Sequence, residues 1–152
     1  MFEKILLPTD FSDCSASAAG VARSMAERFG SRVTVLYVLD EPAALDPMFR
    51  GDVPLEMLRS RMEQFARENM ESFLGRHFSG FANFDTVLAS GIPYREIIGK
   101  ARELGADLIV IGTHGRTGVE HVIFGSTAEK VVRMAPCPVL TVRQGESEFV
   151  RP

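Results

Sequence analysis

Short apolar runs alternate with amphipathic segments along the whole chain, and this alternation limits the possible folds more than any other feature. Strands separated by helices indicate βαβ units and a parallel sheet. Several runs are apolar at consecutive positions, which is typical of strands covered by helices on both faces. The expected strands are Ile5–Leu7, Val33–Val38, Phe84–Leu88, Leu108–Ile111 and Val139–Val142. The sequence therefore predicts an α/β fold with an open, parallel, five-stranded sheet.

Four helices are expected, and most of them have a recognisable start or stop. Ser12 is a good N-cap, Pro93 suits a first helical position, and glycine is common just past a helix end. The expected helices run from after Ser12 to Gly30, from Leu55 to near Gly75, from Pro93 to Gly105, and from Ser126 to before Pro136. Their apolar residues recur at helical spacing, including Phe29 in the first helix and Val132 in the fourth.

The chain is 152 residues long and 45% hydrophobic, which fits a single domain with a substantial core. A domain of about 150 residues buries roughly 70% of the surface that its unfolded chain exposes. We expect one domain over residues 1–143, followed by a polar tail over residues 144–152. Glu41–Pro54, with three prolines, is expected to be a loop that either covers a ligand or makes a surface excursion.

Charge and composition exclude several classes of function. The net charge is −3 and no basic block is present, so no nucleic-acid partner is expected. Cys14 and Cys137 are far apart, and the three histidines form no recognisable zinc set. No apolar run approaches the ~20 residues that span a bilayer, and the first residues do not resemble a signal peptide. We therefore expect a cytoplasmic protein with no membrane partner.

Glycines follow the fourth expected strand in the pattern Gly112-x2-Gly115-x9-Gly125-Ser126. Glycine permits positive φ and lets main-chain amides approach an anion closely. Ser126 opens the last expected helix, whose free amides and positive dipole end would point to the same place. Arg116 lies between these glycines as a mobile cation. The pattern predicts a phosphate-binding site, and the alternative is a plain strand–loop–helix connection.

These features together resemble the ATP-binding branch of the universal stress protein family. The matching segments are Lys4–Ser12, Gly91–Pro93, the glycine pattern up to Ser126, and Pro136–Val142, within about residues 2–143. The resemblance implies an adenine-nucleotide alpha-hydrolase-like fold with strand order 3-2-1-4-5, and a homodimer formed through the last strand, Val139–Val142. An edge strand this apolar would otherwise be an aggregation hazard.

The resemblance also implies a site for ATP, with Mg²⁺ as its companion ion. Asp10 would accept from the ribose or the adenine amine, or reach the metal through water; alternatively, it only turns the chain into the first helix. The Val38 side chain would contact the adenine ring; alternatively, it belongs to the core. His114 could act as an acid or base, although loop histidines are more often surface hydrogen-bonding residues. The implied nucleotide-binding residues are Pro8, Thr9, Asp10, Val38, Gly112, Thr113, Gly115, Arg116, Gly125, Ser126 and Thr127.

Three functions remain open at this point. The first is a cytoplasmic ATP-binding regulator or sensor in the stress response. The second is a slow ATPase or nucleotide hydrolase of the same fold, although no catalytic residue is assigned and no Gly-x4-Gly-Lys-Ser/Thr loop is present. The third is a structural dimer without a ligand. Retention of nucleotide by the purified protein would separate the third from the other two.

Overall fold

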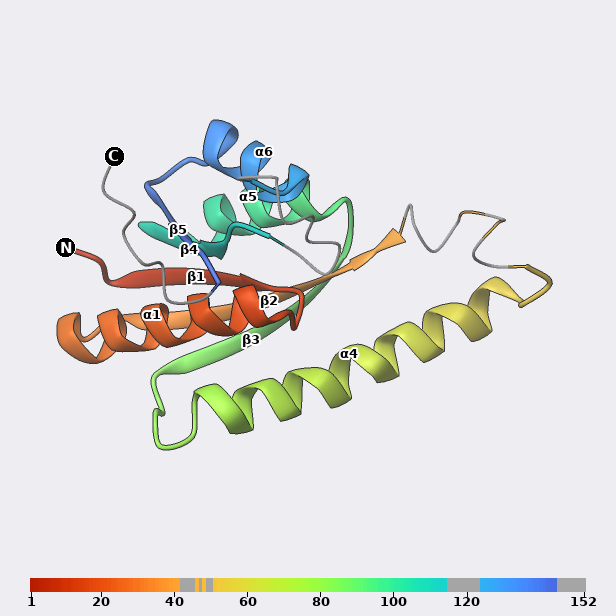
Figure 1. Cartoon of the computed structure of the whole chain (residues 1–152), viewed down its shortest axis with the longest axis horizontal. Coiled ribbons are helices and arrows are strands. Elements are labelled where there is room, and N and C mark those ends of the chain that lie inside the picture. Colours follow the sequence, from red (N-terminus) through yellow and green to blue (C-terminus); the bar gives the residue numbers. More distant parts are fainter. Residues whose placement is uncertain (42–45, 47, 49–50, 115–123, 145–152) are drawn as a thin grey trace.

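Five parallel strands form one sheet in the order β3-β2-β1-β4-β5 (Figure 1). This computed structural model describes residues 1–41, 46, 48, 51–114 and 124–144. The strands are β1 Lys4–Thr9, β2 Arg32–Asp40, β3 Phe84–Gly91, β4 Leu108–Gly112 and β5 Val139–Val142. The predicted α/β fold and strand order are confirmed, and four of the strands are longer than the apolar runs that predicted them.

The sheet is covered by helices on both faces (Figure 1). α1 and α4 pack on one face, and α5 and α6 pack on the other. Their bounds are α1 Asp13–Phe29, α4 Leu55–His77, α5 Pro93–Leu104 and α6 Ser126–Met134. Within β1, Ile5 and Leu7 join the core under α1 and α4, whereas Leu6 joins the core under α5 and α6. Apolar residues at consecutive positions thus serve two cores.

The predicted helix ends are confirmed where local chemistry determines them. The Ser12 side chain caps α1 by accepting a hydrogen bond from the Ser15 amide at 3.2 Å. Gly30 and Gly105 end α1 and α5 in the left-handed conformation, with φ values of 71° and 61°. α4 continues past Gly75 to His77, because a single glycine weakens a helix without ending it.

Phe29 and Val132, which belong to the predicted apolar stripes, lie outside the core. Phe29 is 52% exposed and packs edge-to-face against Phe2, with ring centroids 6.2 Å apart. Val132 is 45% exposed, because it follows buried Val131 and successive residues point about 100° apart around a helix axis. Helical spacing therefore located the helices correctly but overestimated the width of the buried face.

Parts of two predicted segments lie outside the described residues. Most of Glu41–Arg50 within the expected loop, and the tail from residue 145 onward, belong to these parts of the chain. Among the described residues, no helix combines the length and the apolar composition that a membrane crossing requires.

Gly112, at the end of β4, generates a stability prediction. A Cβ built there would lie 3.0 Å from the main-chain carbon and the Sγ of Cys14. Gly112→Ala should therefore destabilise the protein by about 1–3 kcal/mol, because the main chain of Cys14 has little freedom to move away. Urea unfolding with a far-ultraviolet circular dichroism readout measures this change.

The matched control is Gly20→Ala, in α1. Gly20 is exposed, and a Cβ added to it would meet no atom from the rest of the fold within 4 Å. This substitution should stabilise α1 by up to ~1 kcal/mol, since alanine is the better helix former. Equal unfolding midpoints for the wild type and Gly112→Ala would contradict the packing role of Gly112.

Candidate functional site

A cavity of about 460 Å³ opens at the carboxyl ends of the strands, around the end of β1. β1 lies between β2 and β4, which is where the order of the strands reverses. Ligands of open α/β sheets bind at this kind of position. The volume also lies within the ~300–1,000 Å³ that is typical of small-molecule sites. Position and size both make this cavity the candidate functional site.

The structure brings the predicted site residues together, as far as it describes them. Gly115 and Arg116 lie outside the described residues. The predicted residues that line the cavity are Pro8, Thr9, Asp10, Val38, Gly112, Thr113, Gly125, Ser126 and Thr127. Sequence reasoning missed lining residues as well, namely Ser15, Leu36, Tyr37, Asp40, Pro93, Ile97, Ile111 and Ala128. Leu36 and Asp40 could have been found, because side chains two residues apart on β2 share a face with Val38.

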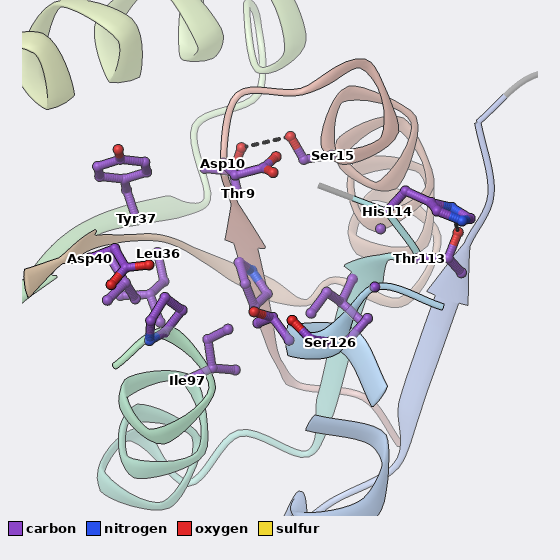
Figure 2. Close-up of a pocket in the computed structure, with 18 residues that line it drawn as sticks. Thr9, Asp10, Ser15, Leu36, Tyr37, Asp40, Ile97, Thr113, His114 and Ser126 are labelled. Carbon is purple, nitrogen blue, oxygen red and sulfur yellow. Dashed lines mark hydrogen bonds between the residues drawn. The ribbon is translucent and has the colours of Figure 1, made fainter. Parts of the chain in front are cut away.

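Figure 2 shows two unlike sides of this cavity. Leu36, Asp40 and Ile97 lie on one side, which we call the β2 side. Thr113 and His114 lie on the other, and Ser126 stands between the two groups near the start of α6. The Tyr37 ring lies on the opposite face of β2 from Leu36 and Asp40. The β2 side is therefore mainly aliphatic, and the α6 side is polar.

β2 extends beyond the end of β1, and this leaves a main-chain acceptor beside the cavity. The last paired residues are Thr9 and Tyr37. The Arg32 amide donates to the Glu3 carbonyl at 2.8 Å. Because main-chain groups alternate in direction along a strand, the amides and carbonyls of the even-numbered residues of β2 point toward β1. The Val38 carbonyl is therefore directed past the end of β1.

If β1 continued alongside β2, its next amide would donate to the Val38 carbonyl, but that amide is bonded elsewhere. It belongs to Phe11, which donates to the Thr9 hydroxyl at 3.0 Å. The cavity thus offers the Val38 carbonyl as an acceptor next to an aliphatic wall that includes Leu36 and Ile97. A flat ring that carries a hydrogen-bond donor on its edge has the shape and chemistry for this side.

The first turn of α6 supplies donors on the other side. Gly125 is the N-cap and has no side chain with which to cap the helix. The first amide of the helical ladder belongs to Glu129, which donates to the Gly125 carbonyl at 3.0 Å. The three preceding amides, of Ser126, Thr127 and Ala128, have no acceptor within the helix. With two hydroxyls and the positive end of the helix dipole, this turn is suited to an anion.

The expectation of positive φ is wrong for the two glycines of the pattern that the structure describes, Gly112 and Gly125. Gly125 has φ −68° and ψ 156°, and its amide donates to the Thr113 carbonyl at 2.6 Å. Gly112 is not among the described glycines with positive φ. Its lack of a Cβ instead permits close packing against Cys14. The donors come from the helix turn after Gly125.

Thr113 connects the end of β5 to the start of α6. Its amide donates to the Val142 carbonyl at 2.9 Å, and its carbonyl accepts from Gly125. Its hydroxyl lies 2.9 Å from the Nδ1 atom of His114. The hydrogen-bonding interpretation of His114 is confirmed by this contact, and its place in the cavity leaves the acid or base role open.

The turn between β1 and α1 places Asp10 at the cavity. One carboxylate oxygen of Asp10 accepts the Ser12 amide at 3.0 Å, so the turn-forming role is confirmed. Asp10 also lines the cavity, and the two roles are compatible. The Thr9 hydroxyl donates to the Ser15 hydroxyl at 3.0 Å (Figure 2). Thr9 therefore supports the turn from within the protein.

The described groups with displaced pKa values lie outside the lining of the cavity. Hydrogen bonding from Arg32 lowers the pKa of Asp85, and burial lowers that of His77. Burial raises the pKa of the Cys137 thiol. In the part of the chain that the structure describes, no three His, Cys, Asp or Glu side chains gather to hold a metal ion.

Known proteins resemble this chain in both sequence and structure. The sequence profile of the universal stress protein family matches residues 1–143. Universal stress protein MJ0531 of Methanocaldococcus jannaschii is 33% identical over 97% of this chain and 86% of its own length. The structure of MJ0577 from the same organism is similar with a TM-score of 0.83 and 28% identity, covering 97% of this chain and 99% of that one.

Two more distant structures were solved with nucleotides. A universal stress protein in complex with cAMP has a TM-score of 0.61 and 19% identity, over 95% of this chain and 98% of its own. The Archaeoglobus fulgidus universal stress protein in complex with dAMP has a TM-score of 0.67 and 21% identity, over 93% and 98% of the two chains. At these identities the likeness is one of fold.

Proposed function

This chain belongs to the universal stress protein family, and from that premise we propose that its cavity binds an adenine nucleotide, with ATP as the main ligand. One observation carries the proposal. A main-chain acceptor beside an aliphatic wall lies at one side of the cavity, and the first turn of α6 lies at the other. An adenine base and a phosphate chain require this pair of environments at opposite ends of one site.

The base would lie on the β2 side. Its exocyclic amine would donate to the Val38 carbonyl, and its faces would contact aliphatic side chains such as Leu36 and Ile97. Asp10, between the two sides, would accept from a ribose hydroxyl. Pro8 and Thr9 would line the base, with Thr9 acting through the turn that its hydroxyl supports.

The phosphates would lie on the α6 side. They would accept hydrogen bonds from the amides of the first turn and from the hydroxyls of Ser126 and Thr127. We extend the proposal to Gly115 and Arg116 on the sequence pattern alone. Because Mg²⁺ keeps most of its waters and binds through phosphates, Asp10 would contact such an ion through water. The cAMP and dAMP complexes of distant family members support the class of ligand.

We place the biological role in nucleotide-dependent regulation within the cytoplasm. The ligand would join the ends of β1 and β2 to the start of α6. A ligand at 100 times its dissociation constant stabilises the bound form by about 2.7 kcal/mol, so the stability of the bound form would follow the nucleotide level. Slow ATP hydrolysis, with His114 beside the phosphates, is the second candidate.

Ser126→Ala tests the phosphate side. Removal of one hydroxyl that bonds a charged phosphate should weaken ATP binding by ~10-fold or more, and adenosine binding little. Isothermal titration calorimetry with ATP and adenosine measures both affinities. Ser72→Ala, at an exposed position of α4, is the control. Wild-type protein that neither retains nor binds ATP would refute the function, and phosphate release in seconds in a single turnover would favour the ATPase.

The Val38 carbonyl predicts which base is accepted. Inosine triphosphate differs from ATP by an oxygen in place of the amine, so it would set an acceptor against an acceptor. We expect ITP to bind about 100-fold more weakly than ATP, the consequence of one unpaired buried acceptor. Competition with a fluorescent ATP analogue measures the ratio. Equal displacement by ATP and ITP would exclude the proposed orientation of the base.

We also propose that two copies of the chain pair through β5. This strand is an edge of the sheet, and Leu140 is 37% exposed. The Ile109 amide donates to the Pro138 carbonyl, and the Thr113 amide donates to the Val142 carbonyl. The main-chain groups of the even-numbered residues of β5 therefore point toward β4. The amide of Thr141 then faces the open edge, where a partner strand would bond.

Thr141→Pro should convert a dimer into a monomer while keeping the β4–β5 ladder, because it removes only an outward amide. Light scattering after size-exclusion chromatography gives the mass, and urea unfolding checks the fold. Thr141→Val, which keeps the amide, is the control and should remain dimeric. A monomeric wild type, or a dimeric Thr141→Pro protein, would refute pairing through β5.

A further inference from the structure

Phe11 has a main-chain conformation that is unusual for its residue type. Among the described residues, it is the only non-glycine residue with positive φ, at 65°. A bulky side chain in the left-handed region is strained, and such residues concentrate at functional sites. Phe11 follows Asp10 directly but is not itself part of the cavity lining. The strain therefore lies one residue away from a proposed ligand contact.

Hydrogen bonds on both sides of Phe11 close this turn. Its own amide donates to the Thr9 hydroxyl at 3.0 Å, and the next amide, of Ser12, donates to Asp10 at 3.0 Å. The Thr9 hydroxyl donates to Ser15, whose hydroxyl donates to the Ser12 carbonyl at 2.9 Å. The bond from Ser12 to Asp10 and the bond from Thr9 to Ser15 join residues on the two sides of Phe11.

The Phe11 ring is held outside the cavity. It stacks on Tyr37 of β2, with ring centroids 4.6 Å apart and an interplanar angle of 21°. It also meets Phe73 of α4 edge-on at 5.8 Å. Figure 2 shows the Tyr37 ring on the opposite face of β2 from Leu36 and Asp40. The ring thus packs the turn against β2 and α4.

We propose that Phe11 is a positioning residue for nucleotide binding: its packed ring selects the left-handed turn that presents the Asp10 carboxylate to the cavity. This inference rests on the proposed function. Glycine would adopt the same turn with less strain, but without the ring the turn would exchange with other conformations. Apparent affinity falls in proportion to the competent fraction, so a turn that is formed one tenth of the time binds about ten times more weakly.

The test is a double-mutant cycle in the full chain. Phe11→Gly should weaken ATP binding by about 10-fold. Asp10→Asn keeps an oxygen for the Ser12 amide but loses the carboxylate, and in that background Phe11→Gly should change the affinity less than twofold. Phe11→Tyr, which keeps the stacked ring, should bind like the wild type. Phe11→Asn, which tolerates the left-handed region without the stacking, should behave like Phe11→Gly and replaces it if that variant does not fold.

A control in the same core distinguishes the positioning role of Phe11 from an effect on stability alone. Phe78→Leu removes a buried ring from the cluster under α1 and α4, at a residue that makes no ring contact with Phe11. It should lower the unfolding midpoint. It should leave the ATP affinity unchanged under conditions in which the variant is fully folded. Wild-type protein that does not bind ATP overturns the proposed function. Wild-type binding with equal losses from Phe11→Gly in both Asp10 backgrounds overturns the positioning role alone.

Discussion

The early end of β1 determines the carboxyl edge of the sheet. β1 stops opposite Tyr37, whereas β2 continues to Asp40. The chain can leave the sheet there because the turn through Phe11 satisfies its own amides with Thr9 and Asp10. Had β1 continued alongside β2, its main chain would have occupied the space that is now the cavity and would have paired with Val38. The cavity at this edge thus lies where the β1–β2 ladder stops before the end of β2.

Periodicity and capping predicted the elements well, because both act within a few residues of sequence. Ser12 and Gly105 determine helix ends by local bonds that do not depend on the rest of the fold. Strand order was different: it came from the resemblance to a family, since an apolar run does not reveal its neighbours. The cavity lining was predicted in part. Asp40 could have been found from the period of two along β2. The hydrogen bond between Thr9 and Ser15 depends on the folded turn, which the sequence pattern does not reveal.

Gly112 and Gly125 line the cavity, but neither has the positive φ that the sequence pattern predicted. Sequence shows that a Cβ is missing but not what occupies its place. At Gly112 the space is filled by the main chain of Cys14, so the residue brings β4 and α1 together. At Gly125 the amide is already bonded, and the residue matters as a cap without a side chain, which leaves the next three amides directed outward. Both glycines shape the site, and neither does so through a left-handed turn.

The α6 side of the cavity depends on the far edge of the sheet. The Val142 carbonyl of β5 accepts the Thr113 amide at 2.9 Å and the Cys14 thiol at 3.3 Å. The Thr113 carbonyl in turn holds the Gly125 amide, and Gly125 starts α6. Two consecutive hydrogen bonds therefore connect an edge strand to the amides that face the cavity. Because hydrogen bonds restrict distance and direction together, the position of the β5 main chain helps to determine where the first turn of α6 points.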